Sequence, residues 1–384
     1  MNNFKALIFL VIAGAIACSS PKNEKNGNSD MEISYEIDTV MVDAGDHFFF
    51  VRFGLGMSDV DKSRKLLYNF NNQDMKMEII DLESLSLKEV REYEKEGPNG
   101  IGGGFIMRVQ VLPDESVLFY DFVGIHHVAK SGEKVTTYKL GEIEWEGDSL
   151  SEEEQIDVSS LATKDGKTFY GFYGAQGFDS KTEGIAQFNV VDKSLKLLPS
   201  DFLEFISAYD ISLQMDGGGM AKSGERKSIS ITDEKVLIMT SAKNQLWQWD
   251  LELDSLVSYP YESQLTSNSK KGNYPVQAGS MEEFRAAITE KNKEVNFGML
   301  VHAPDQDKFW RYHREMERMT AGDTIIYKNV LTAFDVELNQ LGEKALPEKF
   351  KNTDPVFYLD GMLWQFLNID DEVAFVRVKP TISE

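Results

Sequence analysis

Residues 80–85 read Ile-Asp-Leu-Glu-Ser-Leu, and this short stretch carries the pattern that decides the fold prediction. An apolar residue stands on each side of Asp81, and Leu85 follows after a polar turn. The same order returns as Phe188-Asn189-Val190 before Leu195, Trp249-Asp250-Leu251 before Leu256, and Phe334-Asp335-Val336 before Leu341. Because Asp or Asn at a strand end accepts hydrogen bonds from turn amides, each copy predicts a hairpin between a third strand and an outer fourth strand.

A degenerate fifth copy reads Ile125-His126-His127-Val128 and precedes a strand at Val135 to Leu140. The separations between Asp81, His127, Asn189, Asp250 and Asp335 are 46, 62, 61 and 85 residues. Four-stranded propeller blades with loop insertions repeat at about this interval. A terminal strand pair, Met362 to Phe366 and Val373 to Val378, adds a sixth unit.

The ends of the chain complete this architecture. The strand predicted around Ser34 to Val42 can supply the outer strand that the terminal pair lacks, which closes the ring. We therefore predict an all-β, six-bladed β-propeller as one domain over residues 34–380. Seven blades and a β-sandwich pair are the alternatives. One short helical insertion is predicted at 281–293, where Met281, Phe284, Ala287 and Ile288 recur at helical spacing.

The beginning of the chain reads as an export signal. After Lys5, residues 6–17 are apolar or small, which is the length of a signal-peptide core and too short to span a bilayer. The run ends in Ala15-Ile16-Ala17-Cys18 and resembles a bacterial lipobox, although Ala15 stands where Leu is usual. Cys18 is the single cysteine of the chain. We predict a lipoprotein signal peptide at 1–17, lipid attachment (palmitate) at Cys18, and a flexible tether at 18–33.

A lipobox followed by six irregular blades, together with the strand Lys308-Phe309-Trp310-Arg311-Tyr312, resembles the six-bladed β-propeller lipoproteins of unknown function common in Bacteroidota. The resemblance covers residues 34–380 and implies a cell-envelope location, with the protein lipid-anchored to the membrane and either periplasmic or surface-exposed. That family has no established activity, so the resemblance assigns no catalytic residue.

Composition restricts the partners. The 384 residues include 63 acids and 40 bases, which gives a formal net charge of -23. This charge argues against nucleic acid and against attraction to anionic lipid headgroups, because both need a basic surface. The partners we expect are the membrane through the lipid anchor, an envelope protein, or a small ligand in the propeller funnel.

Motifs for cofactors or metals are incomplete. The Gly-rich stretch at 215–224 has Glu225 where a phosphate loop needs Lys, and the Gly-rich stretch at 97–104 precedes a strand instead of a helix. Pro304 stands between His302 and the acids Asp305 and Asp307. This arrangement is typical of a polar turn and not of a metal site. We predict no cofactor and no metal site.

Three arginines stand inside or beside apolar and aromatic runs, and these are the candidate ligand-binding residues: Arg52, Arg108 and Arg311. A guanidinium in such a run either pairs with a carboxylate or grips an anionic ligand in the funnel. A carboxylate partner is expected for Arg311, while its neighbours Trp310 and Tyr312 pack the blade.

The predicted function is a membrane-anchored envelope lipoprotein that acts as a non-catalytic binding or interaction module. The alternative is a propeller enzyme, a lyase or hydrolase acting on a glycan or peptide. The 63 acids are too numerous for a catalytic carboxylate pair to be selected from the sequence.

Overall fold

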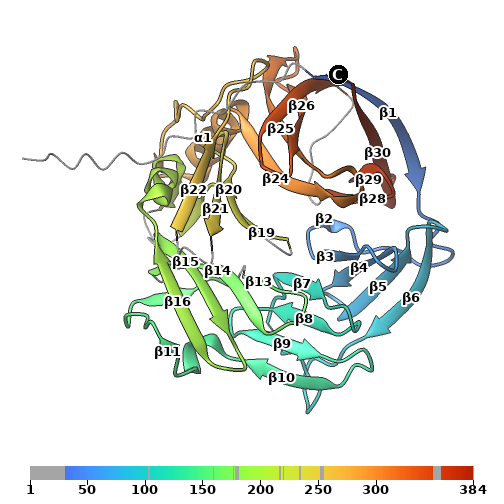
Figure 1. Cartoon of the computed structure of the whole chain (residues 1–384), viewed down its shortest axis with the longest axis vertical. Coiled ribbons are helices and arrows are strands. Elements are labelled where there is room, and N and C mark those ends of the chain that lie inside the picture. Colours follow the sequence, from blue (N-terminus) through green and yellow to red (C-terminus); the bar gives the residue numbers. More distant parts are fainter. Residues whose placement is uncertain are drawn as a thin grey trace, which may run out of the picture.

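The computed structural model describes residues 31–383, except for 103, 159, 176, 178–180, 216–217, 219, 233–234, 251–254 and 349–355. Cys18, the predicted signal peptide and the predicted tether up to residue 30 lie outside the described residues. Figure 1 shows a ring of small β-sheets whose colours progress once around a common axis. The prediction of an all-β propeller is confirmed, and the ring differs from the β-sandwich pair that was the alternative.

Six sheets with four or more strands lie around the ring in the described part of the chain, and we number them as blades, inner strand first. Blade 1 contains β3 (Ser58–Asp61), β4 (Leu66–Asn71), β5 (Lys76–Asp81) and β6 (Ser86–Glu92). Blade 2 contains β7 (Arg108–Val111), β8 (Val117–Tyr120), β9 (Ile125–Val128) and β10 (Lys134–Tyr138). Blade 3 contains β12 (Glu154–Ile156), β13 (Leu161–Ala162), β14 (Thr168–Ala175), β15 (Thr182–Asn189), β16 (Ser194–Pro199) and β11 (Glu146–Gly147).

The second half of the ring follows the same plan. Blade 4 contains β19 (Lys227–Ile231), β20 (Val236–Thr240), β21 (Gln245–Asp250) and β22 (Ser255–Pro260). Blade 5 contains β24 (Asn296–Ala303), β25 (Lys308–Met319), β26 (Ile325–Asp335) and β27 (Gln340–Leu346). Blade 6 contains β28 (Val356–Leu359), β29 (Met362–Ile369), β30 (Glu372–Ser383) and β1 (Glu32–Met41).

The two ends of the described chain meet in blade 6. Strand β1 pairs antiparallel with β30 along its whole length, as the sequence predicts for the N-terminal strand. Asp38 and Arg377 stand opposite each other in this register, and Arg377 Nε donates to Asp38 Oδ1 at 2.8 Å. The ring is thus closed by hydrogen bonds between residues more than 300 positions apart in the sequence.

The repeated Asp and Asn residues form the predicted hairpins. Asp81 Oδ1 accepts from the amides of Glu83 and Ser84 at 2.9 and 3.0 Å. Asn189 Oδ1 accepts from the next two turn amides, those of residues 191 and 192, in the same way. Both turns join the third and fourth strands of a blade, which confirms this reading of the repeat.

Antiparallel pairing within the blades gives the ring two distinct faces. The top face carries the turns between second and third strands and the connections between blades, whereas the bottom face carries the other turns. Met31 donates its backbone N–H to Leu341 O at 3.3 Å, directly after the bottom turn between β26 and β27. Glu32 and Ser383 pair at the same end of blade 6. Both termini of the described chain therefore lie at the bottom face.

Two top-face connections build an additional three-stranded sheet. It contains β18 (Met220–Ser223), β17 (Ile211–Gln214) and β23 (Gln277–Ala278), and the parallel pairing of β17 with β23 links the two connections on either side of blade 4. Helix α1 (Met281–Lys293) covers this sheet, starts at the N-cap Ser280 and buries Phe284 and Ala287. The predicted helical insertion is confirmed. Short 3-10 helices occur at η1 (Leu140–Glu142), η2 (Asp201–Tyr209) and η3 (Pro304–Gln306).

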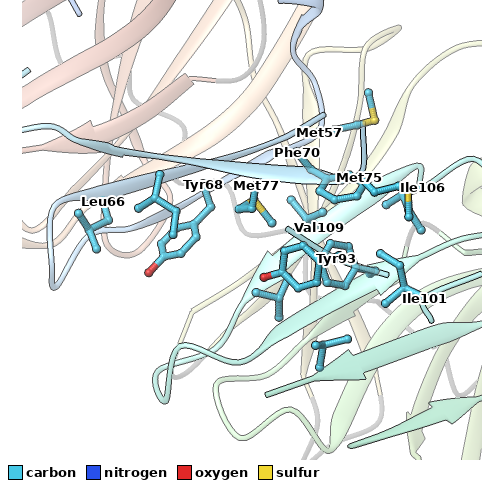
Figure 2. Close-up of a cluster of buried hydrophobic side chains, with 14 residues drawn as sticks. Met57, Leu66, Tyr68, Phe70, Met75, Met77, Tyr93, Ile101, Ile106 and Val109 are labelled. Atoms are coloured by element: carbon cyan, nitrogen blue, oxygen red, sulfur yellow. The ribbon is translucent and has the colours of Figure 1, made fainter. Parts of the chain in front are cut away.

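The hydrophobic core lies between neighbouring blades. Figure 2 shows the cluster between blades 1 and 2, where Tyr93, Ile101 and Ile106 pack beside side chains of the strands. These three residues belong to the top-face connection between the two blades, and each is at most 8% exposed. Burying one such side chain stabilises the fold by about 1.5–3 kcal/mol. The connection is therefore anchored in the core.

Candidate functional site

Arg311 lies on β25, buried between blades 4 and 5 with 1% exposure. Its Nη2 donates to Asn244 Oδ1, and its guanidinium stands 5.1–5.6 Å from the ring centroids of Phe297, Phe334 and Tyr261. Arg311 forms no ion pair with a carboxylate of the described residues, so an amide and three rings occupy the place of the expected acid. Burial lowers the pKa of Arg311 to about 10.

The neighbours of Arg311 point the other way along the strand. Trp310 and Tyr312 are at most 2% exposed and pack in the cluster shared by blades 5 and 6, which confirms their predicted packing role. His313 returns to the side of Arg311, and burial together with that cation lowers the pKa of His313 to about 3.

The other two candidate arginines lie far from Arg311 around the ring. Arg108 begins β7 on the inner side of blade 2 and is half-buried near Asp59, whose Oδ2 accepts from Val111 N at 2.7 Å. Burial raises the pKa of Asp59, and the charge of Arg108 opposes that rise. Arg52 is exposed in β2 (Arg52–Leu55), with its guanidinium 5.5 Å from the ring of Phe53. The three arginines do not form one cluster, and their role in ligand binding stays a prediction.

The adjacent histidines His126 and His127 and the separate His302 have different surroundings. His126 contacts Asp121 and Thr137, while His127 contacts Ser116 in the bottom turn of the same blade. His302 stacks on Phe309 with the ring centroids 4.7 Å apart. Within the described ranges, no group of three or more His, Cys, Asp or Glu side chains is placed to hold a metal ion.

The most unusual surface of the described chain consists of exposed aromatic rings on the top face. Phe48, Phe53, Phe105 and Phe122 are 87%, 50%, 48% and 79% exposed, and Val123 beside them is 58% exposed. We call these five residues the Phe surface. Since a Phe side chain spans about 150–250 Å², the four rings expose roughly 500 Å² of apolar area. Apolar areas of a few hundred Å² on one face of a soluble protein are often functional.

The rings come from three loops that lie next to one another. Phe53 and Phe105 meet edge to face with their centroids 5.8 Å apart. Gly104, beside Phe105, approaches the turn of Phe122 so closely that an added Cβ would lie 3.1 Å from Asp121 Oδ2. The loop between β1 and β2, the connection between blades 1 and 2, and the turn between β8 and β9 therefore form one continuous part of the top face.

A buried carboxylate fixes the loop of Phe48. Glu78 on β5 is 0% exposed, and its Oε1 accepts from the backbone N–H of Phe50 at 3.0 Å. Asn69 Nδ2 donates to Glu78 Oε2 at 2.7 Å, and His47 Nε2 lies 2.9 Å from Oε1. Because Glu78 has partners on both sides of Phe48, the exposed ring stands on a rigid loop.

The other two loops are held in the same manner. Asn72 Oδ1 accepts from the backbone N–H of Ile106 at 3.0 Å, next to Phe105. Asp121 is 1% exposed, and its Oδ1 accepts from the backbone amides of Val123 and Gly124 at 2.8 and 3.0 Å. Each loop of the Phe surface thus combines an apolar tip with a polar anchor; Glu78 and Asp121 are buried and Asn72 is half-buried.

A groove opens beside Phe122 and Val123. Its volume is about 580 Å³, and it runs between the β8–β9 turn and residues 139–158, which lead into blade 3. Its apolar lining includes Leu140, Ile143, Trp145, Leu150 and Ile156, and its polar lining includes Glu142, Glu152 and Glu154. We call it the blade 2–3 groove. A volume in this range suits a small ligand or a few side chains of a partner.

No sequence pattern predicted the Phe surface, although Arg52, a candidate ligand-binding residue, lies at its edge. One local signal was available: Asp121-Phe122-Val123-Gly124 has Asp and Gly flanking two apolar residues, which is typical of a tight turn. A turn of two apolar residues exposes both of them. Phe48 has no comparable signal, because the sequence does not distinguish it from the adjacent Phe49, which is only 6% exposed.

The fold has solved relatives. The structure of a DUF4221 family member from Bacteroides vulgatus has a TM-score of 0.65 and 14% identity, with 93% of this chain and 100% of that chain covered. A protein from Bacteroides fragilis has a TM-score of 0.50 and 8% identity, with 94% and 98% covered. At these identities the likeness concerns the fold. Among curated proteins, none matches the sequence.

A family model matches most of the chain directly. The domain of unknown function DUF4221 matches residues 30–345, which include β1 and reach into β27. The resemblance to propellers of unknown function from Bacteroidota is confirmed by this match and by the two Bacteroides structures. The chain belongs to the DUF4221 family.

Proposed function

We propose that this protein is an envelope lipoprotein, anchored through Cys18, that acts as a non-catalytic binding module and takes a partner protein on its Phe surface. The observation that carries the proposal is the exposure of four phenylalanines on adjoining loops of the top face. The four exposed rings, with a summed apolar area of roughly 500 Å², are costly in water and are stabilised when a partner covers them.

The position of the described N-terminus supports this orientation. Residue 31 leaves the ring at the bottom face, beside Leu341, whereas the Phe surface lies on the top face. A lipid at Cys18 would therefore attach the chain on the side of the bottom face, opposite the Phe surface. The net charge of -23 also disfavours an anionic bilayer as the partner of this surface.

The polar anchors of the three loops favour a binding role for the exposed rings. Glu78, Asn72 and Asp121 hold their loops through hydrogen bonds to backbone amides. A surface that is ordered before binding loses less conformational entropy when a partner arrives. Rigid aromatic side chains are also the residue type that contributes most to protein interfaces.

The location rests on the predicted lipobox. The Bacteroides fragilis relative is described, provisionally, as an exported protein, which agrees with an envelope location. None of the helices in the described residues is long and apolar enough to cross a membrane.

Co-purification from detergent-solubilised membranes tests the proposal. The test protein carries Phe48→Ser, Phe105→Ser and Phe122→Ser, and the matched control carries Val135→Ser and Val191→Ser on strand and turn positions away from the Phe surface. We expect a stoichiometric partner with the wild type and the control, and at least a tenfold loss with the triple variant. Equal recovery with all three proteins would reject the Phe surface as the binding site.

A further inference from the structure

The blade 2–3 groove has three properties that together define a ligand. It is lined by aromatic and aliphatic side chains, its charged lining residues are mostly acidic, and one wall includes an edge strand. We infer that the groove binds an extended peptide segment of a partner protein in which apolar residues are separated by Lys or Arg. This inference rests on the proposed function and names the partner's chemistry at the same part of the top face.

The apolar part of the argument comes from the groove lining. Phe122 and Val123 stand at the groove and also belong to the Phe surface, so one partner could cover both. Trp145 packs edge to face on Phe188 with the centroids 5.7 Å apart, which fixes its ring in the wall. A peptide side chain such as Leu or Phe that enters the groove would be removed from water.

The backbone of the occupant also has partners. Strand β12 forms the end of its sheet and pairs with β14 on one side. Its residues Glu154, Gln155 and Ile156 all line the groove. A strand edge holds extended peptides through main-chain hydrogen bonds.

The charges of the lining select basic residues. Glu142, Glu152 and Glu154 line the groove, whereas Lys139 is the one basic residue of its described lining and already donates to Glu142 at 2.9 Å. The excess of carboxylates attracts Lys or Arg and repels acidic segments. Other occupants, such as a second copy of this chain with its net charge of -23, fit this groove less well.

A peptide of alternating leucine and lysine, labelled with fluorescein, tests the inference by anisotropy on the mature chain. Glu152→Lys should weaken binding about three- to fivefold through charge reversal. Trp145→Ala, which removes the aromatic ring from the groove wall, should weaken it about fivefold. Glu337→Lys, on an exposed bottom turn, makes the same change in net charge and should alter binding less than twofold.

Three results would overturn the inference. The first is that Glu152→Lys and Glu337→Lys weaken peptide binding equally, which indicates an effect of net charge alone. The others are that a peptide with Glu in place of Lys binds equally well, or that the wild type binds no peptide. Any of these with retained partner co-purification leaves the Phe surface as the interface and removes the groove from it. If the wild type and the triple Phe variant instead recover the partner equally, while peptide binding still depends on the groove residues, the proposed function is rejected and the groove remains a peptide site.

Discussion

The carboxyl group of Glu78 accepts a hydrogen bond from the backbone N–H of Phe50 at 3.0 Å, and through it a fully buried side chain in blade 1 fixes a loop at the top of the ring. Two residues earlier, Phe48 is 87% exposed. The pairing of a polar acceptor with an exposed ring recurs in the loops of Phe105 and Phe122, where Asn72 is half-buried and Asp121 is buried. Polar side chains therefore order the loops that carry an apolar surface, which is expected where that surface binds a partner.

Replacing Glu78 tests this relationship. Glu78→Gln turns one acceptor oxygen into a donor amide that faces the donors Phe50 N–H and Asn69 Nδ2. We expect a loss of about 1–3 kcal/mol in the free energy of unfolding and faster hydrogen exchange at the Phe50 amide. Asp81→Asn is the control, because Asn189 performs the same turn role elsewhere in the ring. Unchanged exchange at Phe50 in Glu78→Gln would contradict the anchoring role.

Ring closure depends on the pairing of β1 with β30. Exchanging the charges of Asp38 and Arg377 tests this pairing. The hydrogen bond from Arg377 lowers the pKa of Asp38, so the pair is charged at pH 7. Asp38→Arg and Arg377→Asp should each lower the midpoint of thermal unfolding because like charges then face each other. The double exchange should restore most of the loss, with a coupling of about 0.5–1 kcal/mol.

The same unfolding curves test the single-domain prediction for 34–380. One cooperative transition is expected in wild type and variants, since each blade packs on two neighbours. Two separated transitions, or a double exchange no more stable than the single variants, would count against closure as described.

His313 predicts a specific pH dependence. Its pKa is lowered to about 3 in the folded protein, against about 6.5 in an unfolded chain. Between these values the unfolded state binds the extra proton, so stability is complete above pH 6.5 and falls as the pH decreases below it. From pH 7 to pH 5 the wild type should lose about 2 kcal/mol through this group. In urea titrations at the two pH values, the free energy of unfolding of His313→Gln should decrease by about 2 kcal/mol less than that of the wild type. An identical decrease in both proteins would refute the role of His313.

The anchor is tested at Cys18. Metabolic labelling with a radioactive fatty acid should mark the wild type, and Cys18→Ala should remove the label because no other cysteine exists in the chain. Cys18→Ala should also move the protein from the membrane to the soluble fraction. Equal labelling of both proteins would reject lipidation at this residue.

The parts of the fold that follow local rules were predictable. Asp81 and Asn189 sit at hairpins because their side chains satisfy turn amides within three residues, and Ser280 to Lys293 carries both a cap and helical spacing. Such signals need no knowledge of distant residues.

The candidate site depends on distant partners and was mostly not predictable. The environment of Arg311 comes from Asn244 and three rings on other strands, so the sequence around it could not exclude a carboxylate partner. Phe48 and Phe49 differ in exposure by 81 percentage points, 87% against 6%, because Glu78, about 30 residues away, sets the path of the loop. A chain position inside an aromatic run gives no sign of that contact.

Photo-cross-linking in intact cells tests the binding role of the Phe surface most directly. The cross-linker p-benzoylphenylalanine is placed at position 48 or 105 on the Phe surface, or at position 191 on an exposed bottom turn. We expect one discrete cross-linked partner protein at 48 and 105, and its absence at 191. Cross-links of equal yield at all three positions, or cross-links at 48 and 105 to lipid or to a second copy alone, would contradict partner binding through the Phe surface.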